Sequence, residues 1–196
     1  MSTTASKRIE SRILPAPGCA SPTVALKVAE IADVHAQLRA AIRGLPPAAF
    51  AWQPAPRTNT IGMLVAHVAL AEVNLAQVVL LAEPRGHTPD VLGLTTDDDG
   101  MPIEKYGSTP PAVLAGKDEA FFQSLIEKTE AHTFAACRTL REEQLGDEIA
   151  RPPRPDGSYR VFDRRWALHH MVEHMAQHLG QLHVLKRQWK AAQPAG

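Results

Sequence analysis

Apolar residues recur every three or four positions in four long stretches of the chain, which is the spacing of an amphipathic α-helix. The pattern predicts helices at residues 23–43, 60–82, 118–141 and 164–192, the last capped by Asp163. Proline and glycine separate these stretches, and no convincing strand lies between them. Four long helices of this kind predict an all-α protein built as a four-helix bundle.

The segments outside these helices divide the chain further. Residues 1–22 carry Ser, Thr, Pro and charge without a sustained period and predict a loosely ordered N-terminal arm, which leaves residues 23–192 as a single domain. Residues 85–116 show little helical period, and a loop of roughly 30 residues in a compact domain is often a lid or a binding loop. A second proline-rich connection spans residues 152–163, where a tight turn at Asp156 would suit a short hairpin.

Charge and composition exclude some functions. Lys and Arg total 21, as do Asp and Glu, so the formal net charge is zero and nothing indicates a nucleic-acid partner. We see no apolar run approaching the ~18–20 residues of a membrane-spanning helix, and we expect a cytoplasmic protein without a membrane partner. Cys19 and Cys137 lie far apart and are expected to be free thiols in a reducing compartment.

Histidine is the one residue type in excess, with nine in the chain. On the fourth predicted helix, His170, His174 and His178 repeat every four residues and therefore lie along one side. The helical wheel places His178 in the core-facing stripe and His174 at its edge. His169 and His183 fall on the opposite side and are expected to be solvated. Because two imidazoles spaced by four residues can reach one ion, we predict that His174 and His178 bind a metal.

A third ligand is predicted from the second helix. The wheel places His67 in the middle of an apolar face, so bundle formation would bring it against His174 and His178. A single inward histidine is more often a hydrogen-bonded core residue. Three of them buried together would leave polar nitrogens unsatisfied without an ion, and this combination favours a metal site.

Several other residues are weaker candidates. His35 faces inward and could line the pocket, although a hydrogen-bonded core histidine is the simpler interpretation. Glu173 points some 100° away from His174, which suits either a contact to a ligand residue or plain surface exposure. The aspartates at 97–99 could bind a hard cation, but their spacing lacks the EF-hand pattern and acidic loops are usually solvated. Gly180 would permit close helix approach.

Two segments resemble a known family: residues 59–67, Asn-Thr-Ile-Gly-Met-Leu-Val-Ala-His, and residues 172–181, Val-Glu-His-Met-Ala-Gln-His-Leu-Gly-Gln. Their order and spacing resemble the DinB/YfiT-like metalloenzyme superfamily. The resemblance implies a four-helix bundle, often dimeric, in which His67, His174 and His178 hold nickel, zinc or a similar divalent ion. Characterised members use low-molecular-weight thiols in S-transfer or isomerisation. Some, such as the mycothiol-dependent enzymes, have glutamate at the position of His174, so the resemblance leaves the thiol open.

Three imidazoles leave a coordination position open, which is typical of a catalytic site. The leading hypothesis is a metal-dependent thiol S-transferase or isomerase acting on a small molecule. In this hypothesis the 85–116 loop and the 152–162 turn close the pocket, and His170, Gln181 and Tyr106 are further contacts. Metal-assisted hydrolysis ranks lower because Glu72 and Glu173 are both expected to point away from the centre. The third alternative is a non-catalytic, dimerising metal-binding stress protein. Zinc, nickel, copper and iron all suit three histidines, so the pattern leaves the metal open.

Overall fold

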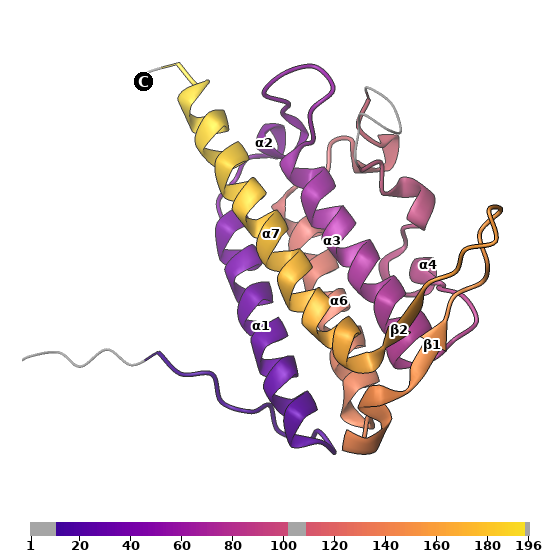
Figure 1. The fold of residues 1–196 in the computed structure, drawn as a ribbon. Coiled ribbons are helices and arrows are strands. Elements are labelled where there is room, and N and C mark those ends of the chain that lie inside the picture. Colours follow the sequence, from indigo (N-terminus) through magenta and orange to yellow (C-terminus); the bar gives the residue numbers. More distant parts are fainter. Residues whose placement is uncertain (1–10, 102–108, 195–196) are drawn as a thin grey trace, which may run out of the picture.

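The computed structural model describes residues 11–101 and 109–194. Four long helices lie side by side and form the bundle (Figure 1). These are α1 (Pro22–Ile42), α3 (Ile61–Leu75), α6 (Glu119–Arg138) and α7 (Arg164–Ala191). Helices α1 and α3 each pack against both α6 and α7. The predicted all-α bundle is confirmed.

A side chain caps the N-terminus of every one of these helices, which explains where each begins. Asp163 accepts a hydrogen bond from the Trp166 amide at the start of α7, as predicted. Thr60 caps α3 by accepting a hydrogen bond from the Met63 amide. Each cap satisfies a backbone N–H group that has no partner within the helix.

The second predicted helix changes its winding near its end. Helix α3 stops at Leu75 and continues as a π-helical segment, Ala76–Leu80. The buried Arg164 donates from Nε to the Leu80 carbonyl at 2.9 Å and from Nη1 to Asp147 at 2.9 Å. This guanidinium therefore joins the end of the π segment to the start of α7.

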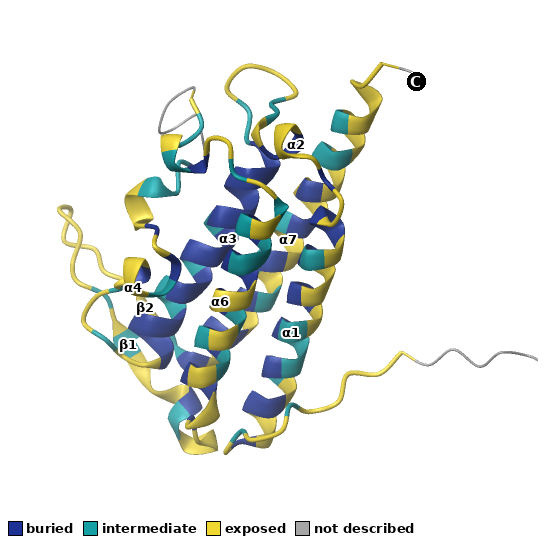
Figure 2. Cartoon of the chain, turned by 180° about the vertical axis from the view of Figure 1, so that it is seen from behind, coloured by how far each residue is buried: buried dark blue, intermediate teal, exposed yellow. Residues whose placement is uncertain are grey.

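Burial accounts for the unusual apolarity of this part of the chain. Residues Ile61–Leu80 contain an apolar window that is long enough to cross a membrane, so the expectation that no apolar run approaches this length was wrong. However, 78% of that window is buried inside the protein, and Figure 2 shows α3 dark blue along most of its length. A helix that is apolar nearly all round is expected at the centre of a core.

A close approach near the start of α3 depends on glycine. A Cβ built on Gly62 would lie 2.7 Å from Cζ of Phe122, whose ring stacks on Phe50 with centroids 4.6 Å apart. Phe50 comes from the short helix α2 (Pro47–Ala51). The predicted role of Gly180 was wrong, because a Cβ there would meet nothing within 4 Å.

The two long connections contain more structure than their sequences indicate. The described part of the connection between α3 and α6 contains α4 (Thr88–Leu92) and the 3₁₀ turns Thr96–Asp98 and Ala112–Leu114. Between α6 and α7, after a 3₁₀ turn at Glu142–Gly146, come the short antiparallel strands β1 (Glu148–Ala150) and β2 (Val161–Asp163). The short hairpin suggested for the turn at Asp156 is therefore confirmed, and within the described residues it is the exception to the expectation that no strand lies between the helices.

The segment before α1 is attached to the bundle. The Ala16 amide donates to the Ala25 carbonyl at 2.9 Å, and the Ala20 amide donates to the Arg138 carbonyl at 3.2 Å. Residues 1–10 of the predicted arm lie outside the described residues. Cys19 and Cys137 are both free thiols, as predicted.

Candidate metal centre

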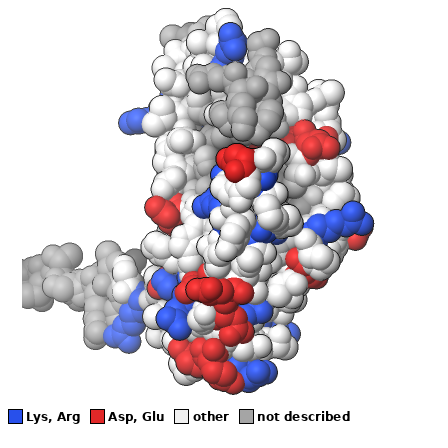
Figure 3. Space-filling model, turned by 45° about the vertical axis from the view of Figure 1, so that its right-hand side comes forward, with Lys and Arg blue, Asp and Glu red and all other residues white. Residues whose placement is uncertain are grey.

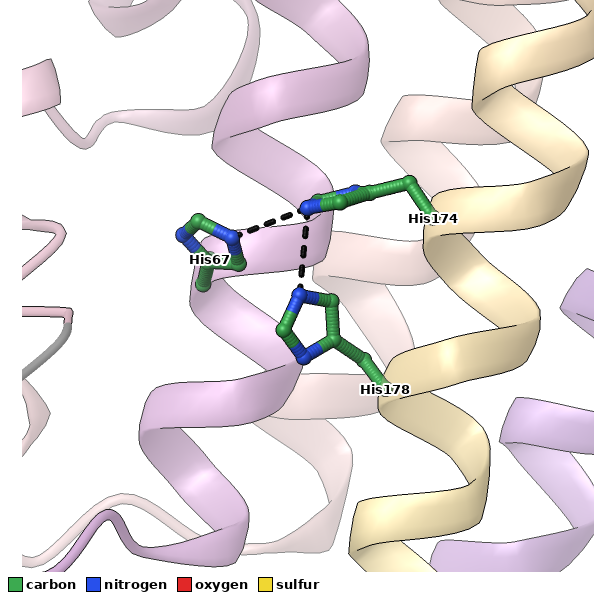
Figure 4. A group of neighbouring side chains, drawn as sticks. All are labelled: His67, His174 and His178. Atoms are coloured by element: carbon green, nitrogen blue, oxygen red, sulfur yellow. Dashed lines mark hydrogen bonds between the residues drawn. The ribbon is translucent and has the colours of Figure 1, made fainter.

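Three histidine side chains from α3 and α7 point toward one another (Figure 4). Nε2 of His67 lies 3.0 Å from Nε2 of His174, and Nε2 of His178 lies 3.1 Å from the same atom. One ring nitrogen from each of the three lies within 4.8 Å of those of the other two. Residues more than a hundred positions apart in the sequence thus meet, as the sequence predicted.

The outer nitrogens of two of these rings are held by oxygen acceptors. Nδ1 of His67 donates to the Asp99 carboxylate, at 2.8 Å and 2.9 Å to its two oxygens. Nδ1 of His178 donates to Oε1 of Gln181 at 2.9 Å. A neutral imidazole carries one proton, so these contacts fix it on Nδ1 and leave a lone pair on Nε2.

The donor set fits a divalent cation. Nε2 of His174 carries at most one proton, so it can donate a hydrogen bond to only one of the Nε2 atoms of His67 and His178. In the other contact two nitrogen lone pairs face each other, which is unfavourable unless a cation lies between them. Two of the three donor separations, 3.0 and 3.1 Å, fall within the about 2.9–3.4 Å expected for nitrogens bound at 2.0–2.1 Å in octahedral or tetrahedral geometry. The third, between His67 and His178, is within 4.8 Å. The residues present therefore suit a three-histidine site.

Burial keeps the imidazoles of His174 and His178 in the form that binds metal. Burial, followed by the nearby histidines His178, His67 and His170, lowers the pKa of His174 to about 3. Burial also lowers the pKa of His178, although the hydrogen bond to Gln181 opposes it. Neutral imidazole is the coordinating species, so no proton has to be displaced from these two rings at neutral pH.

His67 is less buried than its apolar neighbourhood predicts. Its side chain is 19% exposed, and it lies on the half-buried stripe of α3 with Ala71, Asn74 and Leu75. The core-facing position predicted from the wheel was therefore wrong, because α3 is buried on most sides and its least buried stripe carries the site. The centre sits at the side of the bundle, where a ligand can reach it from solvent.

Asp99 is the site residue that sequence reasoning missed. It directly follows the 3₁₀ turn Thr96–Asp98, in which Asp98 accepts hydrogen bonds from the amide and hydroxyl of Thr95. Gly100 then adopts φ +62, and a Cβ there would lie 2.5 Å from Pro111. The available signal was the acidic run at 97–99 together with the rule that a metal-bound histidine donates its second nitrogen to a carboxylate or carbonyl.

The other predicted contacts have mixed outcomes. His170 lies beside the centre, with its ring centroid 5.4 Å from that of His174. Glu173 points outward, is 48% exposed, and lies 3.5 Å from Nδ1 of His170 rather than near the three convergent nitrogens. Gln181 contacts His178 as described, and Tyr106 lies outside the described residues.

His35 belongs to a separate buried polar cluster. Its Nε2 donates to Glu72 at 2.9 Å, and Thr133 donates to the other oxygen of that carboxylate at 2.7 Å. Burial lowers the pKa of His35, but the charge and hydrogen bond of Glu72 outweigh it, so the net change raises the pKa. The interpretation of His35 as a hydrogen-bonded core histidine, rather than a pocket residue, is supported.

Among the described residues on the face shown in Figure 3, basic and acidic side chains are both present and form no broad basic area. This distribution matches the balanced composition of the chain.

The bundle and the three convergent histidines define the class: the chain has the DinB/YfiT-like fold. It belongs to the mycothiol-S-transferase family, whose model matches residues 28–191. Among solved structures, a conserved protein from Enterococcus faecalis is 18% identical and has a TM-score of 0.61. That alignment covers 85% of this chain and 96% of the other, and it supports the fold alone. The search of curated proteins found no match.

Proposed function

We propose that the protein binds one divalent ion, zinc or nickel, through Nε2 of His67, His174 and His178, and catalyses S-transfer or isomerisation with a low-molecular-weight thiol. The observation that carries the proposal is the convergence of three Nε2 atoms, two of which have their proton fixed on the other nitrogen by Asp99 and Gln181. Membership of the mycothiol-S-transferase family supports the thiol reaction.

The chain supplies the binding groups but no suitable thiol in its described part. Burial raises the pKa of Cys137 to about 12, and burial also raises the pKa of Cys19. Since the thiolate is the reactive form, an external thiol has to provide the nucleophile. A bound divalent ion would favour the thiolate of such a cosubstrate.

Residues of the chain would orient the imidazole rings that bind the ion. Asp99 holds the proton of His67 on Nδ1, and Gln181 holds that of His178 in the same way, so both rings keep their Nε2 lone pairs directed inward. The partial exposure of His67, whose side chain is 19% exposed, leaves a path for the thiol and its electrophile. The family name indicates mycothiol as the first cosubstrate to test, with bacillithiol and glutathione beside it.

The first experiment is metal analysis of protein purified without an affinity tag. We expect about one equivalent of zinc or nickel, and loss of that metal in His67→Ala, His174→Ala and His178→Ala. His169→Ala and His183→Ala are matched controls, because both residues are exposed on α7 outside the cluster. Unchanged metal content in the three cluster variants would refute the proposed metal site.

The second experiment is a conjugation assay of the metal-loaded protein, with each of the three thiols and an alkylating electrophile such as monobromobimane. We expect turnover with one thiol and its loss in His174→Ala, but not in His183→Ala. Stoichiometric metal without reaction with any thiol would defeat the transferase proposal and keep the metal site. Light scattering on the same preparation tests the predicted homodimer.

Hydrolysis has less support from the geometry. Glu72 is engaged by His35 and Thr133, and Asp99 is engaged by His67, so both carboxylates have partners of their own. The melting temperature distinguishes a purely structural metal site from a functional one. A protein that the ion only stabilises would lose much of its stability when the ion is removed by a chelator.

A further inference from the structure

A cavity of about 200 Å³ lies beside the candidate metal centre, between α3, the start of α7 and β2. Its wall includes His174, His170, Trp166, Phe162 and Arg160. The volume is below the ~300–1,000 Å³ of sites that enclose drug-sized ligands. The cavity therefore has room for a small molecule or for one end of a larger one.

Four rings form a continuous row along this wall. The centroid of Phe162 lies 4.6 Å from that of Trp166, and Trp166 stacks on His170 at 4.5 Å with an interplanar angle of 16°. His170 in turn lies 5.4 Å from His174. The row thus leads directly from the hairpin to one of the three convergent histidines, and its aromatic surface suits a flat, unsaturated ligand.

A cation stands at the far end of the row. The guanidinium of Arg160 lies 4.8 Å from the centroid of Phe162 and 5.9 Å from that of Trp166. Within residues 11–101 and 109–194, no carboxylate forms an ion pair with it, although Glu148 lines the adjoining hollow. Stacked arginine retains its planar set of N–H donors, which match the two oxygens of a carboxylate.

The carboxylate of Glu72, in the cavity wall, does not pair with the Arg160 guanidinium. Glu72 is buried and receives hydrogen bonds from His35 and Thr133. Glu173 lies at the outer side of His170, 3.5 Å from its Nδ1. A ligand carboxylate at Arg160 would therefore meet an unpaired positive group next to an apolar surface.

We propose that this cavity binds a carboxylate-bearing, unsaturated electrophile, with Arg160 pairing to the carboxylate and the ring row placing the unsaturated part beside His174. The proposal rests on the proposed function, because it assigns the substrate class to the same site. It makes Arg160 a residue that determines specificity, supplied by the hairpin rather than by the helices that hold the histidines.

Calorimetric titration with benzoate, and with its neutral counterpart benzamide, tests the charge requirement. We expect zinc-loaded protein to bind benzoate more tightly than benzamide, and Arg160→Gln to weaken benzoate binding about tenfold or more. Arg154→Gln is the matched control, because Arg154 is exposed on the same connection and does not line the cavity. Equal binding of benzoate to both variants, or equal binding of benzoate and benzamide, would overturn the proposal.

The same titration on metal-free protein separates this proposal from the proposed function. Benzoate binding that depends on Arg160 with and without zinc supports the cavity even if metal analysis fails. Benzoate binding that requires zinc and is unchanged in Arg160→Gln would mean that the ion alone holds the carboxylate, and it would overturn the role of Arg160. Arg160→Lys, which keeps the charge without the planar donors, is expected to bind with intermediate affinity.

Discussion

The Asp99 carboxylate accepts a hydrogen bond from Nδ1 of His67 at 2.8 Å, and this contact determines what the opposite nitrogen can do. With the proton on Nδ1, Nε2 presents a lone pair 3.0 Å from Nε2 of His174. A loop residue thus sets the tautomer of a helix residue 32 positions away. Carboxylates in this position raise the basicity of a metal-bound histidine and restrict its rotation.

Replacement of Asp99 is therefore expected to weaken metal binding without abolishing it. Asp99→Asn should lower zinc affinity by about 10–100-fold, measured by competition with a chromogenic chelator. Asp97→Asn is the control, because Asp97 is exposed in the same turn. If the two variants bind zinc equally, Asp99 has no role in orienting His67.

The four helices and the three convergent histidines were predictable because both depend on periodicity. Apolar spacing located the helices, and the spacing of His174 and His178 placed them on one side of α7. The histidine on α3 was found through the need for a third ligand. Its position on the least buried stripe of α3 was not predictable, because α3 is apolar on nearly every side and its periodicity does not identify which side the neighbouring elements cover.

The contacts that the connecting segments make with the helices could not be predicted from the sequence. The Asp99–His67 pair and the Arg160 guanidinium over Phe162 both depend on how an irregular segment folds back on a helix. Turn chemistry at Thr95 and Gly100 fixes the first, and the short hairpin β1–β2 fixes the second. Such long-range loop placement has no periodic signal in the sequence.

Acid should destabilise the metal-free protein through His174. Its native pKa of about 3 lies below the ordinary 6.5, so between these values the unfolded chain binds a proton that the native protein does not. Stability then falls as the pH falls below 6.5. His35 acts in the opposite direction, because its raised pKa stabilises the native state at low pH and that contribution is lost as the pH rises through the native pKa.

Comparison with a variant isolates the His174 contribution, because His35 is common to both proteins. Denaturant unfolding with chelator present, between about pH 7.5 and pH 5, should show a smaller loss of stability for His174→Gln than for wild type. His169→Gln, at an exposed position of α7, should follow wild type. Parallel curves for His174→Gln and wild type would show that the native protein protonates this ring freely.

The two cysteines should be dispensable for any thiol reaction. Burial raises the pKa of Cys137 to about 12, so in the native state it should resist a disulfide reagent that modifies it after unfolding. Cys137→Ala should keep metal content and thiol turnover, measured as above, at a moderate cost in stability. Loss of turnover with metal content intact would point to the chain itself as the source of the nucleophile.

Two glycines should respond oppositely to alanine. At Gly62 the new methyl group would meet Phe122 at 2.7 Å and the Phe50 carbonyl at 3.0 Å, and such overpacking costs about 1–3 kcal/mol. At Gly180 nothing lies within 4 Å, so alanine should stabilise α7 by about 0.5–1 kcal/mol through helix propensity. Urea unfolding measures both. If Gly180→Ala were less stable than wild type, Gly180 would be needed for close helix approach after all.

The buried pair of His35 and Glu72 should show strong coupling. Each side chain is at most 2% exposed, and Nε2 lies 2.9 Å from Oε2, so Glu72→Leu strands an imidazole and the Thr133 hydroxyl in the core. Removing one partner of a buried pair typically costs about 3–5 kcal/mol, whereas replacing both with apolar groups is often nearly neutral. The double variant His35→Leu with Glu72→Leu should therefore be more stable than Glu72→Leu alone. Additive losses in a double-mutant cycle would mean that the two groups contribute independently, which their shared hydrogen bond makes physically unexpected.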